Sequence, residues 1–179
     1  HSETSTAAAS DIAAIGAVVA KTPAVLIVDA ISSAAGMPIK TDEWQIDIVC
    51  TGSQKALMLP PGLAFAVVSE KAWKIIESFK PKAFYFDYRA YRKAIKDTDT
   101  PYTSALTLVK GLNKSIEMIR KEGIENVWAR VAKLAAASRA AFQAMGIKLY
   151  AADPADSVTA FWIPDGVDEG AFRKTMRAQ

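Results

Sequence analysis

Two charged residues follow apolar runs of the kind that form buried strands, and together they could carry out amine chemistry. Asp29 ends the run 24–29, and Lys55 comes just after the run 47–52. Ligands collect at the carboxyl ends of strands in open α/β sheets, so neighbouring strands would bring Asp29 and Lys55 into one crevice. Burial disfavours the charged form of a lysine. A neutral lysine amine at this edge could form a Schiff base.

Simpler explanations compete for the same residues. An aspartate after a strand often caps the next helix, and a lysine is usually solvated. Cys50 lies inside a strand pattern, which favours core packing over nucleophilic chemistry. The aromatic residues at 85–91 favour packing under a loop, and the basic run 89–96 favours a solvated helix face.

Composition excludes several classes of site. The 179 residues are 51% apolar and 23% charged, which is typical of a globular protein with its own core. A net charge of +3 is too small to indicate nucleic acid or an anionic membrane as the main partner. One cysteine excludes an internal disulfide, and a single histidine, His1, excludes a two-histidine metal site. No glycine-rich phosphate loop is present, which argues against nucleotide-dependent hydride or phosphoryl transfer.

Hydrophobic periodicity predicts an α/β protein. The predicted helices span 6–21, 72–79, 87–95, 105–122, 124–145 and 168–177, and the predicted strands span 24–29, 47–52, 63–69, 147–150 and 158–163. In the first three predicted strands, apolar and polar residues do not alternate. These strands are therefore expected to be buried on both faces, as in a parallel sheet. Near Gly123 the predicted elements change from a region of strands and helices to a helix–strand–strand–helix unit, which predicts a domain boundary there.

The ends of the chain carry further expectations. No apolar run reaches the 18–20 residues that a membrane span needs, and the polar start is unlike a secretory signal. The chain does not begin with Met, and the last predicted helix stops without a cap. We therefore expect a piece of a longer protein.

Several short motifs together resemble one enzyme family. They are HSETST at 1–6, VDAISS at 28–33, TGSQKAL at 51–57, PPG at 60–62, GIENVWAR at 123–130 and PDG at 164–166. In this order, with 25 residues from Thr4 to Asp29 and 26 from Asp29 to Lys55, the whole chain resembles the class V pyridoxal-phosphate aminotransferases. The serine–glyoxylate and alanine–glyoxylate group is the most similar.

The resemblance implies a fold and an activity. Residues 1–122 would be the second half of the large cofactor-binding domain of a fold-type I enzyme, a mostly parallel sheet with flanking helices. Residues 123–179 would begin its α+β small domain, in a chain about half the family's length, so the piece alone is expected to be inactive. The parent enzyme would move an amino group from serine or alanine to a 2-oxo acid such as glyoxylate. It would be a cytoplasmic homodimer with shared sites, without metal, nucleic acid or membrane partners.

The resemblance also assigns the catalytic residues. Lys55 would form a Schiff base with pyridoxal 5′-phosphate and, once freed, would shuttle the proton between the substrate Cα and C4′ of the cofactor. Asp29 would pair with the pyridine nitrogen and keep it protonated, so that the ring can accept electrons.

Five further residues would hold the cofactor. Gln54 and Thr4 would form hydrogen bonds around the ring hydroxyl, and Ile31 would pack on one face of the ring. Thr100 and Thr103 match a segment that, in the family, reaches the cofactor phosphate of the neighbouring subunit.

Two departures from the family pattern matter. Ala7 stands where the family usually has glycine, and alanine is costly there if the backbone needs a positive φ. The family's upstream phosphate loop, its ring-stacking aromatic residue and its downstream arginine for the substrate carboxylate have no match here.

Two alternatives remain besides transamination. One is a different class V chemistry, such as a lyase or a desulfurase. A desulfurase needs a mobile reactive cysteine, and the strand position of Cys50 disfavours it. The other alternative is a chain that keeps the fold without the activity.

Overall fold

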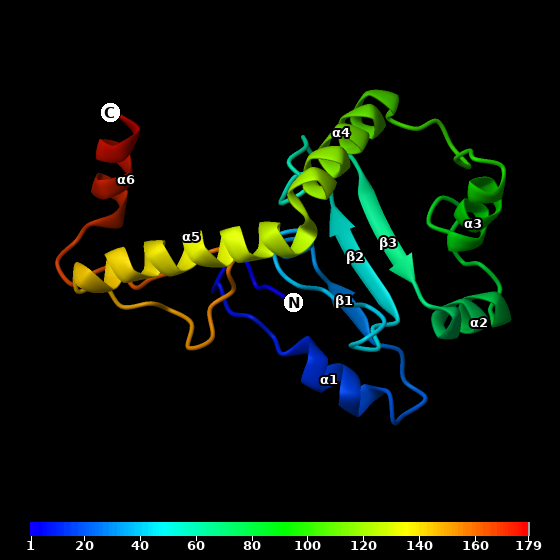
Figure 1. Cartoon of the computed structure of the whole chain (residues 1–179), viewed down its shortest axis with the longest axis horizontal. Helices are drawn as coiled ribbons and strands as arrows, with labels where there is room; N and C mark the ends of the chain where they lie inside the picture. The colour runs from blue at the N-terminus through cyan, green and yellow to red at the C-terminus, as the bar shows by residue number, and fades with distance from the viewer. Residues whose placement is uncertain (179) are drawn as a thin grey trace.

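The computed structural model describes residues 1–178, which form a three-stranded sheet flanked by helices (Figure 1). The strands are β1 (Ile27–Asp29), β2 (Ile48–Gly52) and β3 (Ala64–Val68), and they lie side by side in that order. β1 and β2 are parallel, whereas β2 and β3 are antiparallel. The α/β prediction is confirmed, but the parallel orientation expected for the third run is wrong. A parallel return would need a helical crossover, and the connection 53–63 contains none.

The helices match the predicted segments, with one large exception at the N-terminus. Their bounds are α1 (Ile12–Val19), α2 (Glu70–Ser78), α3 (Tyr88–Lys96), α4 (Leu106–Glu122), α5 (Ile124–Ala144) and α6 (Glu169–Arg177). Asp11, Ser69, Asp87 and Asp168 each cap a helix by accepting a hydrogen bond from its first turn. Within residues 1–178, no helix combines the length and apolar character needed to cross a membrane.

The helix predicted for 6–21 begins only at Ile12. The residues before it form an antiparallel turn, in which the Glu3 N–H donates to the Ala8 carbonyl at 2.9 Å and the Ser10 N–H donates to the His1 carbonyl at 2.9 Å. Alanine is the best helix former, so the alanine-rich sequence favours a helix locally. Contacts between distant residues override that preference here.

Two predictions about strands were also wrong. The strands expected at 147–150 and 158–163 reduce to one isolated bridge between Leu149 and Phe161. Burial of β1 on both faces is not observed either, because Val28 is buried while Ile27 is 62% exposed. Val28 packs against Ile12 of α1, whereas Ile27 and Asp29 are on the exposed face of β1.

The core lies between α1 and the covered face of the sheet. It consists of Ile12, Val28, Ala30, Ile46 and Val49, with Leu26, Ala34, Ile39 and Trp44 packed around them. Gly16 permits the close approach of α1, since a Cβ on it would lie 1.9 Å from the Trp44 carbonyl oxygen. α1 therefore packs against the segment 44–46 through a residue without a side chain.

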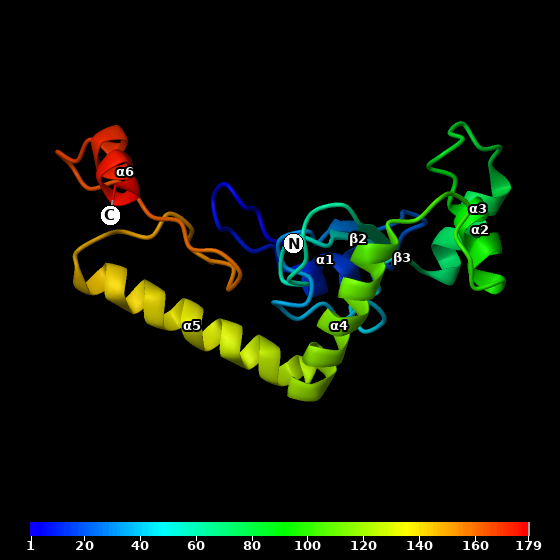
Figure 2. The same cartoon turned by 90° about the horizontal axis from the view of Figure 1, so that it is seen from above.

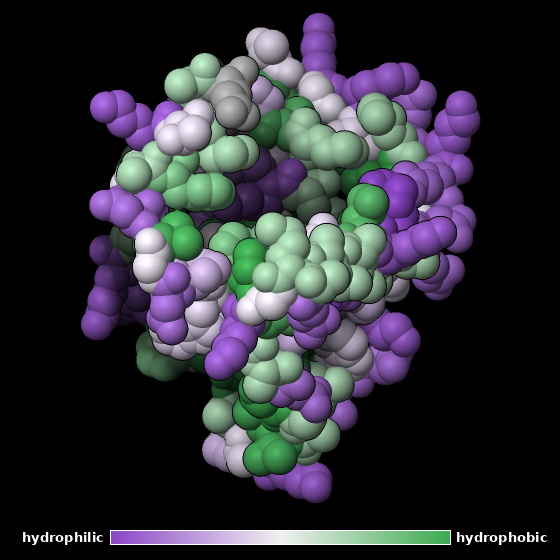
Figure 3. All heavy atoms as spheres, turned by 90° about the vertical axis from the view of Figure 1, so that its left-hand side faces the viewer, coloured by the Kyte–Doolittle hydropathy of each residue, from purple (hydrophilic) through white to green (hydrophobic). Residues whose placement is uncertain are grey.

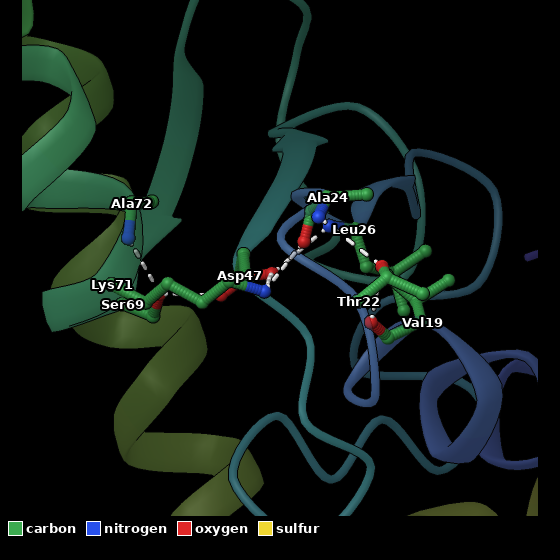
Figure 4. A network of polar contacts seen from close by, with 8 residues as sticks. All are labelled: Val19, Thr22, Ala24, Leu26, Asp47, Ser69, Lys71 and Ala72. Atoms are coloured by element: carbon green, nitrogen blue, oxygen red, sulfur yellow. Dashed lines mark hydrogen bonds and ion pairs between the residues drawn. The ribbon is translucent and has the colours of Figure 1, made fainter.

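One buried carboxylate ties together the starts of β1, β2 and α2 (Figure 4). Asp47 accepts hydrogen bonds from the Leu26 N–H at 2.9 Å, the Ser69 hydroxyl at 2.9 Å and the Lys71 ammonium at 3.0 Å. Burial by itself would raise the pKa of Asp47, but these hydrogen bonds and the Lys71 charge outweigh it and lower the pKa below its ordinary value. The ionised carboxylate thus stabilises the end of the sheet opposite to Asp29.

The C-terminal region extends away from the sheet. Gly123, at φ +87°, ends α4 and starts α5, which carries the chain outward (Figure 2). On the face that includes α6, apolar side chains lie around a hollow (Figure 3). Trp162, Phe172 and Met176 of the C-terminal region are exposed. A domain boundary between residues 122 and 123 stays a prediction.

Candidate active site

Asp29 and Lys55 lie at the same edge of the sheet. β1 and β2 are parallel neighbours, with Asp29 directly opposite Cys50 in the register. Lys55 follows shortly after Gly52, the last residue of β2. The adjacency of the two strands, on which the sequence argument depended, is observed. The burial expected for a lysine here is wrong, because both Lys55 and Asp29 are exposed, as a site that receives a soluble ligand requires.

The Asp29 carboxylate is held by the turn that follows it. One oxygen, Oδ1, accepts a hydrogen bond from the Ile31 N–H at 2.9 Å. The Asp29 carbonyl accepts a bond of 2.8 Å from the backbone nitrogen of His1. Turns rather than a helix follow, so Asp29 caps a turn and is not a helix cap. Within residues 1–178, the other carboxylate oxygen accepts no hydrogen bond and is available to a ligand.

Ser53 fixes the loop that carries Lys55. Its side chain is fully buried, donates to the Pro60 carbonyl at 2.7 Å and accepts from the Leu63 N–H at 3.2 Å. Its backbone adds a bond from the Leu59 N–H at 3.1 Å. A short loop held at both ends restricts where Lys55 can lie.

A second serine holds the same loop from α4. The Ser115 hydroxyl donates to the Leu57 carbonyl at 2.6 Å, and its side chain is buried. The apolar residues Leu106, Val109 and Ile116 on the same helix are exposed. Sequence reasoning missed Ser115, because the only signal was one polar residue within a helix read for its apolar stripe.

The turn at 4–7 brings Thr4 to the segment that follows Asp29. The Thr4 and Ser32 hydroxyl oxygens lie 2.5 Å apart, and Ile31 beside them is half-buried. Ala7 closes this turn at φ +57° and is fully buried. The position therefore needs the left-handed conformation that glycine would adopt freely, at a cost of about 1 kcal/mol for alanine.

His1, which sequence reasoning left outside the site, joins this turn to the Asp29 segment. Its Nδ1 lies 3.0 Å from the hydroxyl of the buried Ser33, and its ring meets Trp44 edge-on at 6.1 Å. Together with the bond from its backbone nitrogen to Asp29, these contacts fix the segment 29–33.

Three further predicted cofactor-binding residues lie in two places: Gln54 in the loop after β2, and Thr100 and Thr103 in the loop before α4. Gln54 is exposed and its side chain folds over the end of β2, since a Cβ on Gly52 would lie 2.8 Å from Gln54 Oε1. Thr100 and Thr103 lie in the loop before α4, which lines a hollow of about 610 Å³, and the Thr100 hydroxyl donates to the Tyr102 carbonyl at 2.7 Å. Among the described residues, no hydrogen bond joins this loop to Asp29 or Lys55.

The residues at the sheet edge fit the cofactor that the sequence implied. Lys55 supplies an amine for an aldehyde, and Asp29 supplies a carboxylate for a basic ring nitrogen. Thr4 and Ser32 supply hydroxyl groups, and Ile31 supplies an apolar contact. Pyridoxal phosphate carries each of the matching groups.

Comparison with known proteins decides the family. A family model described as aminotransferase class V matches residues 1–177. The chain belongs to the class V aminotransferase family. Members of this family depend on pyridoxal phosphate, in agreement with the donor set at the sheet edge.

Two curated aminotransferases and one solved structure illustrate the similarity. The L-aspartate–glyoxylate aminotransferase of Paracoccus denitrificans is 44% identical over 173 residues, which cover 94% of this chain and 44% of that enzyme. The serine–glyoxylate aminotransferase of Hyphomicrobium methylovorum is 39% identical over 183 residues, which cover 98% and 45%. The crystal structure of pyridoxamine-pyruvate aminotransferase from Mesorhizobium loti superposes with a TM-score of 0.93 at 38% identity, covering 99% of this chain and 47% of that one.

This chain of the class V family thus spans about half the length of the curated relatives that it matches. The solved relatives have the fold-type I architecture, which confirms the predicted fold class.

Proposed function

We propose that the protein to which this chain belongs is a pyridoxal-phosphate aminotransferase that passes an amino group from an amino acid to a small 2-oxo acid such as glyoxylate. The observation that carries the proposal is the position of Asp29 and Lys55 at the ends of two adjacent parallel strands. Two similar enzymes are named for glyoxylate and a third for pyruvate, which supports a small 2-oxo acid as acceptor.

Each predicted site residue would have its own role in the transamination. When bound, pyridoxal phosphate weakens the bonds at the substrate Cα by withdrawing electrons into its ring. The Lys55 amine would hold the cofactor and then take the proton from the substrate Cα. The Asp29 carboxylate would hold a proton on the ring nitrogen. Thr4 and Gln54 would orient the ring through its hydroxyl, and Ile31 would pack on one face of it.

Serine or alanine is the proposed amino donor. The serine–glyoxylate relative supports serine, while the relative named for aspartate shows that the donor varies among similar enzymes. The residues that would bind the substrate carboxylate have no match in this chain, so a direct comparison of donors is needed.

A homodimer with shared sites is also proposed. Thr100 and Thr103 lie in an open loop and make no hydrogen bond to Asp29 or Lys55 within residues 1–178. The Thr103 hydroxyl would reach the cofactor phosphate of a second subunit, and the Thr100 hydroxyl would join it by leaving the Tyr102 carbonyl, to which it donates at 2.7 Å.

The test uses the purified protein to which this chain belongs, with added pyridoxal phosphate. We expect a visible absorption band, its loss in Lys55→Ala, and its retention in the matched surface variant Lys21→Ala. Glyoxylate is then offered with serine, alanine or aspartate, and the glycine formed is measured. Glycine from serine or alanine supports the proposal. No band, or no glycine from any donor, contradicts it, and sulfide release from cysteine would identify a desulfurase instead.

A further inference from the structure

Three segments of backbone form a small ladder beneath the turn that carries Thr4. Residues 1–3 pair with 8–10 on one side, through the bonds between Glu3 and Ala8 and between Ser10 and His1. Residues 153–155 pair with 7–9 on the other side, where the Ala9 N–H donates to the Asp153 carbonyl at 2.9 Å and the Ala155 N–H donates to the Ala7 carbonyl at 2.7 Å. The segment after α5 thus returns to the N-terminal turn (Figure 1). We refer to these segments as the N-terminal ladder.

The outer segment of the N-terminal ladder is held by one side chain. Arg139 of α5 donates to the Ala155 carbonyl at 2.6 Å, to the Pro154 carbonyl at 3.3 Å and to an oxygen of Asp156 at 3.1 Å. The Arg139 side chain is only 16% exposed, and Ala155 is fully buried. Arg139 therefore satisfies two backbone carbonyls of this segment and pairs with the carboxylate that follows them.

The chemistry of the contact is specific to arginine. A planar guanidinium offers several donors in a fixed arrangement, so it can reach two carbonyls and a carboxylate together. A lysine ammonium is a single point charge and cannot span the same three acceptors in this geometry.

The contact also explains how Ala7 stays in a strained conformation. A non-glycine residue at φ +57° persists only where its surroundings hold it. The bond from Ala155 to the Ala7 carbonyl is one such restraint, and Arg139 fixes Ala155 in turn. The turn 4–7 places the Thr4 hydroxyl beside Ser32, so its shape bears directly on the cofactor site.

We propose that Arg139 is a positioning residue for the cofactor site: it holds residues 153–156 against the turn 4–7 and so sets the position of Thr4. Its role toward the cofactor rests on the proposed function. The contact links α5 to the site, although Arg139 itself touches neither Asp29 nor Lys55 among the described residues.

The first test measures backbone amide hydrogen exchange in the cofactor-free full-length protein. Arg139→Met is compared with Arg130→Met, a matched control on the same helix whose 53% exposed side chain pairs with Glu122 instead. We expect exchange to rise about tenfold or more in both 4–10 and 153–157 for Arg139→Met, with no change at 64–70. Arg130→Met should leave all three segments unchanged.

The second test measures the dissociation constant of pyridoxal phosphate in the same variants. We expect about a tenfold weaker affinity in Arg139→Met and wild-type affinity in Arg130→Met. If the wild-type protein does not bind the cofactor, the proposed function is contradicted. Raised exchange in Arg139→Met would still support the structural link between residues 153–156 and the turn 4–7. Wild-type exchange at 4–10 in a folded Arg139→Met would overturn the inference.

Arg139→Lys decides the matter if Arg139→Met does not fold. This variant keeps the charge and the aliphatic stem but loses the fork of donors. Raised exchange at both 4–10 and 153–157 then supports the inference, and wild-type exchange in both segments overturns it.

Discussion

Asp29 and Cys50 are partners in the parallel register of β1 and β2, so the Asp29 carboxylate and the loop beginning at Ser53 leave the sheet at the same edge. Lys55 lies in that loop. Backbone pairing therefore brings an acid and an amine, 26 residues apart in the chain, to the same edge of the sheet. The geometry of the site depends on this pairing and on the hydrogen bonds that fix the two connections.

Replacing Asp29 separates its electronic role from its role in the turn. In Asp29→Asn the amide oxygen can still accept the Ile31 N–H, so the turn and most cofactor binding should persist. A neutral amide cannot hold a proton on the ring nitrogen. We expect proton abstraction from the substrate Cα to slow by about three orders of magnitude.

Single-turnover kinetics with the amino donor measures this change, and Asp42→Asn, at an exposed position, serves as the control. A loss of less than about tenfold would mean that Asp29 only caps the turn.

The Ser115 hydroxyl should matter to the loop that carries Lys55. Ser115→Ala leaves the Leu57 carbonyl without its 2.6 Å hydrogen bond, at an expected cost of about 1–2 kcal/mol in the free energy of unfolding. We also expect slower transamination, because the loop then holds Lys55 less firmly.

Ser138→Ala is the matched control, since that exposed hydroxyl donates only to Leu134 of its own helix. Thermal unfolding and steady-state rates compare the two variants. If the two variants have the same stability and the same rate, the Ser115 hydroxyl does not hold the loop that carries Lys55.

These results show which features a sequence can reveal. Asp29, Lys55 and Thr4 were predicted because each stands in a short motif beside a recognisable strand or turn. Ser53, Ser115 and Arg139 were missed as holding residues because they bind backbone carbonyls, which every residue type offers. Hydrogen bonds of this kind leave no pairing signal in one sequence.

The wrong predictions of secondary structure have one common cause. The alanine-rich start of 6–21 has a strong local helix preference, but residues 7–9 pair instead with 153–155. Likewise, the apolar character of β3 predicts a strand but not its orientation, which follows from the length of its connection to β2. Interactions between distant residues decided each case.

Asp47 should make stability depend on pH in the acid range. Its pKa in the folded protein is lower than the ordinary value of 3.8, so the ionised form stabilises the folded state fully above that value. As the pH falls from 3.8 through the lower folded pKa, the unfolded state gains the proton first and this stabilisation is lost.

Asp47→Asn should therefore unfold more easily than wild type at pH 7, by about 1–3 kcal/mol, and the gap should close in acid. Melting curves between neutral and acid pH measure it. Asp42→Asn, an exposed control, should follow wild type throughout. A gap that stays constant down to acid pH would show that the Asp47 charge does not contribute.

The central claim is that Lys55 is the residue that holds the cofactor. The most direct measurement is borohydride reduction of the full-length protein loaded with pyridoxal phosphate, followed by peptide mapping of the labelled lysine. The account predicts one stoichiometric pyridoxyl label on Lys55, in the peptide that also contains Ser53 and Gln54, and no such label in Lys55→Ala. A label on a different lysine, or stoichiometric labelling that survives in Lys55→Ala, would contradict it.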